Sequence, residues 1–301
     1  MIARYPRLRR YPAAFRALTG LTGSQFDALW AEAAPRLAEA ERDRLTRPGR
    51  QRQIGGGHPF ALDERDRVLL TVVWLRRYPI YDVLGLLFGI SQETAVRTVP
   101  RVLPILEAAG LTSMRGRDPG KYRRPDLAGL LRETPELAVI VDTFEQRIER
   151  PTDPATADTY SSGKQKQHTL KVQVAVDEGG GIMDIAPSVR GPTNDLALLR
   201  ASGLPDRLPP EVGSLGDLAY VGIAAVSPHG APPRRKPRSK PRPPEDIAFN
   251  TAFARRRVIV EHAIGRLRSC EALAQRDRHH RRLHTARVRA VAGLVNRRLA
   301  G

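Results

Sequence analysis

Leu137-Ala-Val-Ile-Val-Asp142 is a run of apolar residues that ends on a carboxylate. A short apolar run of this kind predicts a buried β-strand. Further along, His168–Asp177 places apolar residues at every second position, and this alternation predicts a strand with one buried face. The apolar positions are Leu170, Val172, Val174 and Val176. The second half of the chain is therefore predicted to contain a β-sheet.

Turn and helix patterns complete this half of the chain. The glycines of Glu178-Gly-Gly-Gly181 predict a turn, after which Ile182–Pro187 pairs back on the preceding strand as a hairpin. Further strands are predicted at 144–150 and 212–215, a loop at 151–160, and helices at 125–134, 194–204, 249–273 and 285–299. This order is that of a ribonuclease H-like fold, in which helices flank a mixed sheet, so the predicted fold class is α/β.

Three carboxylates fall at comparable points of these elements. Asp142 ends the first predicted strand, Asp217 follows the fourth, and Glu261 lies in the first long C-terminal helix. In a ribonuclease H-like sheet the first and fourth strands are neighbours and face the last helix, so the three side chains are expected to converge. Such a cluster needs cations, and hard oxygen ligands select Mg²⁺ or Mn²⁺. We predict two divalent ions, one activating a hydroxyl and one stabilising the leaving oxygen of a phosphodiester.

Each carboxylate also has a structural alternative. Asp142 could be a turn residue at a strand end, and Asp217 could form an Asx-type turn. Glu261 lies in an apolar stretch and is expected to need a metal or a partner, for which Arg257 one turn earlier is the candidate. Asp195 competes with Asp217 for the second catalytic position. We assign Asp195 a supporting role, because a carboxylate in a first helical turn is explained by capping and by the helix dipole.

The first half of the chain is predicted to be helical. Helices are expected at 13–18, 22–40, 63–77, 81–88 and 91–106, with Ser24 as a possible cap of the second. A short helix, the Gly89-Ile-Ser91 turn and a helix capped by Ser91 form the pattern of a helix-turn-helix, at about residues 62–108. Gln92, Thr94 and Arg97 are then the residues expected to meet base edges. The alternative is an ordinary helical hairpin.

Charge indicates the partner. Lys and Arg number 50 against 32 Asp and Glu, which gives a net charge of +18 and favours double-stranded DNA. One cysteine excludes a disulfide scaffold and a cysteine-ligated zinc site. Glycine- and arginine-rich connectors are expected at 47–58 and 110–124. With no predicted membrane span or signal peptide, we expect a cytoplasmic, nucleoid-associated protein.

A basic, proline-rich segment at 227–245 separates Asp217 from Glu261 and is predicted to lack regular structure. It lies where a DNA strand would enter the predicted site, so phosphate contacts are expected. A solvated run of charge is the alternative. The expected contact residues are Arg234, Arg235, Lys236, Arg238, Lys240 and Arg242.

Five motifs occur in an order that resembles the DDE transposases of the superfamily-endonuclease type, related to PIF/Harbinger elements and bacterial insertion sequences. The motifs are Val141-Asp142-Thr143, Tyr160-Ser-Ser-Gly163-Lys-Gln-Lys-Gln-His168-Thr-Leu-Lys171, Gly191-Pro-Thr-Asn-Asp195, Gly216-Asp217-Leu-Ala-Tyr220-Val-Gly222 and Arg257-Val-Ile-Val-Glu261-His-Ala-Ile-Gly265-Arg-Leu-Arg268. The chain departs from the usual pattern at Asn194, Ala219 and Arg268, where the family more often has His, Gly and Lys.

The resemblance implies roles for particular residues. Asp142, Asp217 and Glu261 match the catalytic triad, and Lys164 and Lys166 match a basic lead-in that contacts DNA. It implies a helical DNA-binding region at 1–115 and a catalytic domain at 125–301.

The expected function is that of a transposase. It would bind the terminal repeats of its element, then cut DNA and transfer a strand into a target site, as a homodimer or larger assembly. A regulator whose second half only dimerises, and a domesticated nuclease, are the alternatives.

Overall fold

A computed structural model describes residues 3–46, 48–49, 61–115, 137–209, 212–227, 229–239 and 241–300. The chain forms two compact units. One comprises Met1–Ser113, Ser269–Ala272 and Ala286–Gly301, and the other Met114–Arg268 and Leu273–Thr285. The domain limits of 1–115 and 125–301 remain predictions. The two compact units differ from these limits, because Ala286–Gly301 belongs to the first unit. The connector at 50–58 and the helix at 125–134 lie outside the described residues.

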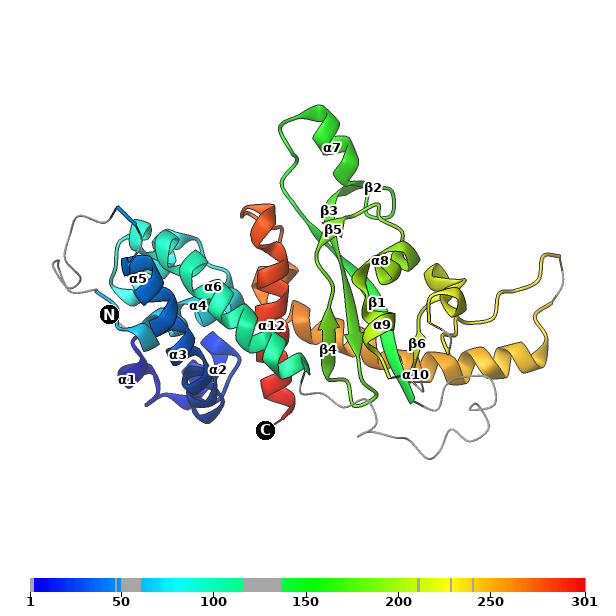
Figure 1. The fold of residues 1–301 in the computed structure, drawn as a ribbon, viewed down its shortest axis with the longest axis horizontal. Helices are drawn as coiled ribbons and strands as arrows, with labels where there is room; N and C mark the ends of the chain where they lie inside the picture. The colour runs from blue at the N-terminus through cyan, green and yellow to red at the C-terminus, as the bar shows by residue number, and fades with distance from the viewer. Residues whose placement is uncertain are drawn as a thin grey trace. The chain divides into compact units, whose positions relative to one another are not determined.

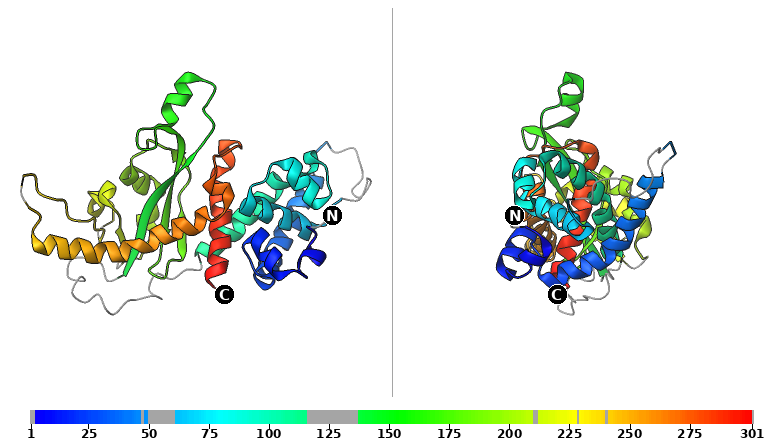
Figure 2. Two further views of the ribbon diagram at one scale, coloured as in Figure 1. Left: turned by 180° about the vertical axis from the view of Figure 1, so that it is seen from behind. Right: turned by 90° about the vertical axis from the view of Figure 1, so that its left-hand side faces the viewer.

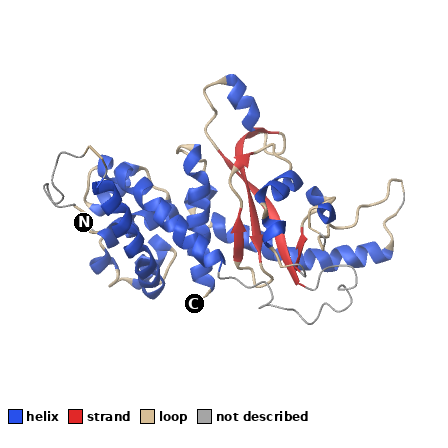
Figure 3. Cartoon of the chain, viewed as in Figure 1, coloured by secondary structure: helices blue, strands red, loops and turns tan. Residues whose placement is uncertain are grey.

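The first unit is helical throughout its described part (Figure 3). Its helices are α1 (Tyr5–Leu8), α2 (Pro12–Thr19), α3 (Gly23–Thr46), α4 (Glu64–Arg77), α5 (Tyr81–Phe88), α6 (Gln92–Arg115) and most of α12 (His284–Leu299). Helix α4 is buried along its whole middle, from Asp66 to Leu75, and forms the centre of the unit. Its start is fixed by Asp63, whose side chain accepts a hydrogen bond from the Asp66 amide at 2.7 Å.

The helix-turn-helix geometry expected at 81–106 is present. Helix α5 ends at Gly89, which adopts φ +61°, a left-handed conformation that glycine enters without strain. The turn is tight, since a Cβ on Gly85 would lie 2.7 Å from the carbonyl oxygen of Ile90. Ser91 Oγ accepts from the Thr94 amide at 3.2 Å and caps α6, as predicted. The cap predicted at Ser24 is wrong, because Thr22 Oγ1 accepts from the Gln25 amide at 3.2 Å instead.

The loop predicted from Gly110 is also wrong at its start, because α6 continues to Arg115. Gly110 is a packing residue. A Cβ placed on it would overlap the carbonyl oxygen of Arg289 in α12, and a Cβ on Gly293 would lie 2.5 Å from the Cα of Gly110. The glycine therefore allows α6 and α12 to approach closely and does not end the helix.

Gly110→Ala is expected to lower the free energy of unfolding by about 1–3 kcal/mol, because the added methyl overfills a backbone contact. Gly265→Ala is the matched control. Gly265 lies in α10 (Pro244–Arg268), a Cβ there meets nothing within 4 Å, and the change should stabilise by about 0.5–1 kcal/mol. Urea unfolding of both variants measures the difference. Equal stabilities would contradict the close helix contact.

The second unit is built on a mixed sheet. Its strands are β1 (Leu137–Arg147), β2 (Ser161–Ser162), β3 (Gln167–Val176), β4 (Ile182–Ile185), β5 (Val189–Arg190) and β6 (Val212–Leu215). The order is β2-β3-β1-β6, with β4 and β5 also paired to β3 (Figure 1). Strand β1 is antiparallel to β3 and parallel to β6. The first predicted strand and the one at 212–215 are therefore neighbours, as the ribonuclease H-like order predicts.

Three predictions in this unit need correction. Phe144–Arg147 is not a separate strand, because β1 stays paired to β3 as far as Arg147 opposite Thr169. Asp142 consequently lies inside β1, opposite Val174, and does not end it. The predicted loop at 151–160 contains helix α7 (Pro154–Tyr160), which Asp153 caps by accepting from the Thr156 amide at 2.7 Å.

Helices cover both faces of the sheet (Figures 1 and 2). Strand β3 is therefore buried on both faces from Thr169 to Val176, where one buried face was predicted. On one face, α8 (Asp195–Ser202), α9 (Leu204–Arg207), η3 (Leu218–Tyr220) and η4 (Ile223–Ala225) pack over the sheet. The core there is Val139, Val141, Ala175, Leu199, Leu204, Val212, Tyr220 and Ile223. On the other face, α10 contacts β1 and β3.

The boundaries of α10 differ from the predicted 249–273. Pro244 begins the helix, so residues 244 and 245 are helical and do not belong to the irregular segment. Glu245 and Asp246 in the first turn complement the helix dipole. The helix ends at Arg268, and α11 (Glu271–Ala274) and η5 (Arg281–Leu283) follow. None of the helices in the described part of the chain is long and apolar enough to cross a membrane.

Candidate active site

Asp142 is held in the middle of the sheet. Its Oδ1 accepts from the Thr143 amide at 2.7 Å, and its Oδ2 lies 3.2 Å from Nη2 of Arg257 in α10. Burial raises the pKa of the Asp142 carboxyl, and the negative charges of Asp217 and Asp195 add to that rise, while the Thr143 amide and Arg257 oppose it. The carboxylate is therefore partly desolvated and surrounded by other acids, which makes a nearby cation favourable.

Asp217 follows β6, the strand that pairs with β1. Leu215, the last residue of β6, pairs with Ile140 in β1. Asp217 follows Leu215 by two residues, as Asp142 follows Ile140, and its negative charge contributes to the raised pKa of the Asp142 carboxyl. Oδ1 of Asp217 accepts from the Ala219 amide at 2.8 Å and caps η3, so the turn role foreseen as an alternative is present as well.

The prediction that Glu261 lies on an apolar helix face and needs a partner is wrong. Its side chain is 58% exposed, so it does not lie on a buried apolar face and burial does not require it to have a partner. The residues that α10 buries are Phe253, Arg256, Ile259, Val260, Ala263 and Leu267. Oε1 of Glu261 lies 3.7 Å from Nη2 of Arg257, which is the ion pair proposed as the alternative.

Arg257 contacts both Asp142 and Glu261. The same nitrogen, Nη2, contacts both Asp142 and Glu261, although Asp142 and Arg257 are 115 residues apart in sequence. The positive group thus occupies the position between the carboxylates. Among the described residues, no three His, Cys, Asp or Glu side chains are close enough together to hold a metal ion.

Asp195 has a different environment. It begins α8, but the cap is Asn194, whose Oδ1 accepts from the Ala197 amide at 3.0 Å. Asp195 instead pairs with Lys171 in β3, with Nζ 2.7 Å from Oδ1, and Nζ also donates to the Thr193 carbonyl at 2.6 Å. The capping role assigned to Asp195 from the sequence is therefore wrong, and its charge is compensated by the buried Lys171.

Tyr220 belongs to the motif that contains Asp217, but the sequence alone did not predict a role for it. Its ring is buried, its hydroxyl has no hydrogen-bond partner among the described residues, and a Cβ on Gly216 would lie 2.5 Å from its Cγ. Burial raises the pKa of the Tyr220 hydroxyl, and Asp195, Asp142 and Asp217 raise it further. The hydroxyl therefore lies within electrostatic range of all three aspartates. Gly216, which directly follows β6, was the only signal in the sequence for this close packing.

The residues expected to bind DNA differ in their solvent exposure and in whether they already form ion pairs. Gln92 and Arg97 are exposed and Thr94 is half-buried, while Arg97 forms a surface ion pair with Glu93 at 2.5 Å. Lys164 and Lys166 are exposed in the turn between β2 and β3.

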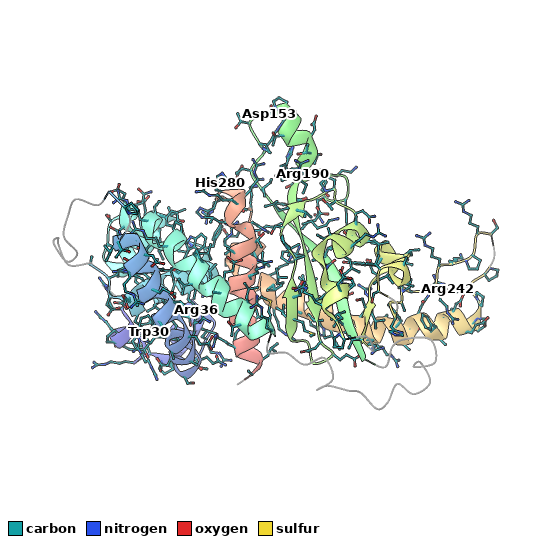
Figure 4. All side chains as sticks on the ribbon, viewed as in Figure 1. Trp30, Arg36, Asp153, Arg190, Arg242 and His280 are labelled. Carbon is teal, nitrogen blue, oxygen red and sulfur yellow. The ribbon has the colours of Figure 1, made fainter. Side chains whose placement is uncertain are left out.

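In the basic segment, Arg234 is already engaged. It lies 2.8 Å from Asp246 and its guanidinium stacks 4.5 Å from the centre of the Phe249 ring. Arg235, Lys236 and Arg238 are exposed, whereas Arg242, near the start of α10 in Figure 4, is half-buried. Lys240 lies outside the described residues.

Comparisons with known proteins agree with this architecture. A family model described as "DDE superfamily endonuclease" matches residues 141–296, and one described as "Helix-turn-helix of DDE superfamily endonuclease" matches residues 60–112. The chain is 28% identical over 264 residues to a probable transposase for insertion sequence element IS702 from Microchaete diplosiphon, covering 88% of each chain. No solved structure matches the chain.

The chain belongs to the DDE superfamily endonuclease family of transposases, and its α4–α6 region is the helix-turn-helix of that family. The predicted class of protein, the ribonuclease H-like α/β fold of its second unit and the helix-turn-helix of its first half are thereby confirmed.

Proposed function

We propose that this chain binds the ends of a mobile DNA element, cuts the DNA and joins a freed strand to a target, using Asp142, Asp217 and Glu261. One observation supports this most. Two carboxylates, Asp142 in a central strand and Glu261 in a distant helix, share a single positive nitrogen, and Asp217 follows the neighbouring strand β6. These acids come from three separate segments.

The donor set fits divalent metal ions. All three candidate ligands are carboxylates, which suit Mg²⁺ and Mn²⁺. Arg257 marks the place of a positive charge between two of them. We propose that Asp142, Asp217 and Glu261 hold two ions, which would activate the attacking hydroxyl and stabilise the leaving oxygen of the phosphodiester. The protein's part is to fix Asp142 through the Thr143 amide and Asp217 through the Ala219 amide.

The positions of the two residues relative to the sheet favour Asp217 over Asp195 as the second catalytic aspartate. Asp142 and Arg257 contact each other, with Arg257 supplied by α10 on one side of the sheet. Asp195 begins α8, whose Leu199 packs with Val139 and Val141 on the opposite side. Its lysine partner also satisfies its charge without a metal. The proposed role of Asp195 is to support the fold beside the site.

End recognition is assigned to α6. Arg97→Ala is expected to weaken binding to the element's ends by about 5- to 150-fold, because a well-placed arginine contact to a base discriminates by roughly 1–3 kcal/mol. Glu93→Gln is the control, since it removes the acid paired with Arg97 and leaves the arginine in place. Electrophoretic mobility shifts measure both. Unchanged affinity of Arg97→Ala would exclude Arg97 from the interface.

The basic segment is proposed to contact phosphates where a DNA strand enters the site. Replacing Arg235, Lys236, Arg238 and Lys240 by Gln should flatten the plot of log K against log salt concentration by about 3.6, at roughly 0.9 per phosphate contact. Arg234 is kept, because its pairing with Asp246 supports the start of α10. An unchanged slope would identify the segment as a solvated loop.

The assembled enzyme is proposed to be a homodimer or larger on DNA, acting on double-stranded terminal repeats and a target site. Genomic sequence separates a transposase from a nuclease retained for another purpose. Inverted repeats and a short target duplication around the gene support the first. Their absence, together with cleavage of unrelated DNA, would support the second.

A further inference from the structure

Arg257 is placed to compete with a metal ion. Its Nη2 lies 3.2 Å from Oδ2 of Asp142 and 3.7 Å from Oε1 of Glu261. A divalent ion bound to the same Asp142 oxygen would lie roughly 2.1 Å from it. The guanidinium and the ion would then be within a few ångströms of each other, beside an aspartate whose side chain is only 18% exposed. Repulsion between cations is strong in such a poorly solvated place, so the two exclude each other.

The contact of Arg257 is more exposed than that of the neighbouring arginine, Arg256. Arg256 and Glu178 form an ion pair in which each side chain is 2% exposed, so this pair is locked in the interior. Arg257 is 16% exposed, and one of its partners, Glu261, is 58% exposed. The Arg257 pair is therefore less enclosed than the Arg256 pair and reaches solvent on the Glu261 side.

A DNA phosphate on the solvent side would offer Arg257 a new partner. Arg257 Nε is buried and has no hydrogen-bond partner among the described residues. A guanidinium presents a planar fork that matches a phosphate with two parallel hydrogen bonds, which its present contact through Nη2 alone does not use. A DNA phosphate at the rim of the site would thus satisfy more of the arginine than the two carboxylates do.

We infer that Arg257 closes the metal site while the chain is free of DNA, and that a backbone phosphate of bound DNA draws the guanidinium away and opens the site. The inference rests on the proposed function. It makes metal binding and DNA binding mutually reinforcing, because each removes Arg257 from a contact that opposes the other. Metal ions would then be held firmly only when a DNA strand is present, which protects the chain from binding metal unproductively.

Calorimetric titration of the full chain with MnCl₂ tests this. Arg257→Gln should bind Mn²⁺ more tightly than the wild type without DNA, by about 5- to 150-fold, the usual size of such couplings. The gap should shrink when a short duplex of arbitrary sequence is present, since phosphate contacts do not depend on sequence. Arg255→Gln is the matched control, because Arg255 is exposed on the same helix and its loss changes the net charge equally.

Arg257→Lys guards against an effect of misfolding, because it keeps the charge and the aliphatic stem but not the fork. Its Mn²⁺ affinity should lie between those of the wild type and Arg257→Gln. Equal Mn²⁺ affinities of Arg257→Gln and Arg255→Gln would overturn the inferred competition between Arg257 and the metal ion, and would leave the proposed metal centre standing. If no variant bound Mn²⁺, with or without DNA, the proposed metal centre would be overturned together with the inferred role of Arg257.

Discussion

Asp217→Asn is expected to abolish DNA cleavage while leaving binding to DNA nearly intact. Asparagine keeps the shape of the residue and can still accept from the Ala219 amide, so η3 stays capped. The substitution removes one negative charge from the proposed metal ligands. Loss of a group that stabilises charge in a transition state costs about 10²–10³-fold in rate, and loss of a metal ligand should cost at least this much. A magnesium-dependent nicking assay on a plasmid with the element's ends measures the effect.

Asp195→Asn is the matched control. The charge lost here is the partner of Lys171, and an asparagine oxygen can still accept from Nζ. We expect stability to fall by about 1–3 kcal/mol, because the buried Lys171 loses its counter-charge, while cleavage persists. If Asp195→Asn were inactive and Asp217→Asn active, the second catalytic aspartate would be Asp195.

The second large effect is expected on stability. Glu178→Gln should lower the free energy of unfolding by about 3–5 kcal/mol, because it removes the negative charge that is paired with the buried Arg256. Glu178 follows β3, and Arg256 precedes Arg257 in α10, so the pair fixes α10 against the sheet. Loss of this pair should therefore also reduce cleavage. Chemical unfolding followed by circular dichroism measures the cost.

The double variant Glu178→Leu with Arg256→Met separates packing from charge. Replacing both members of a buried ion pair by apolar residues is often neutral or stabilising. We expect the double variant to recover most of the stability lost in Glu178→Gln. A single variant within about 1 kcal/mol of the wild type would show that the pair is not a constraint on α10.

Short-range patterns predicted much of this fold. The apolar run at 137–142, the alternation at 168–177 and the glycines at 178–181 correspond to β1, β3 and the turn before β4. The turn at Gly89 and the cap at Ser91 gave the helix-turn-helix, since these features depend on local backbone conformation. The adjacency of β1 and β6 followed from the order of elements.

The remaining features depend on contacts between distant residues. β1 continues past Asp142 because β3 lies beside it to Thr169, which no local pattern contains. Gly110 resembles a helix end in sequence, but it packs against Arg289, which lies 179 positions later. The exposure of Glu261 and the double contact of Arg257 depend on how α10 is rotated against the sheet. Its apolar residues alone did not define this rotation.

The most direct test of the proposed catalytic centre is the number of Mn²⁺ ions bound per chain in complex with duplex DNA. The wild type and Asp195→Asn are predicted to bind two. Asp142→Asn, Asp217→Asn and Glu261→Gln are each predicted to bind fewer. Two tightly bound ions in all three of these variants would contradict a metal centre formed by Asp142, Asp217 and Glu261.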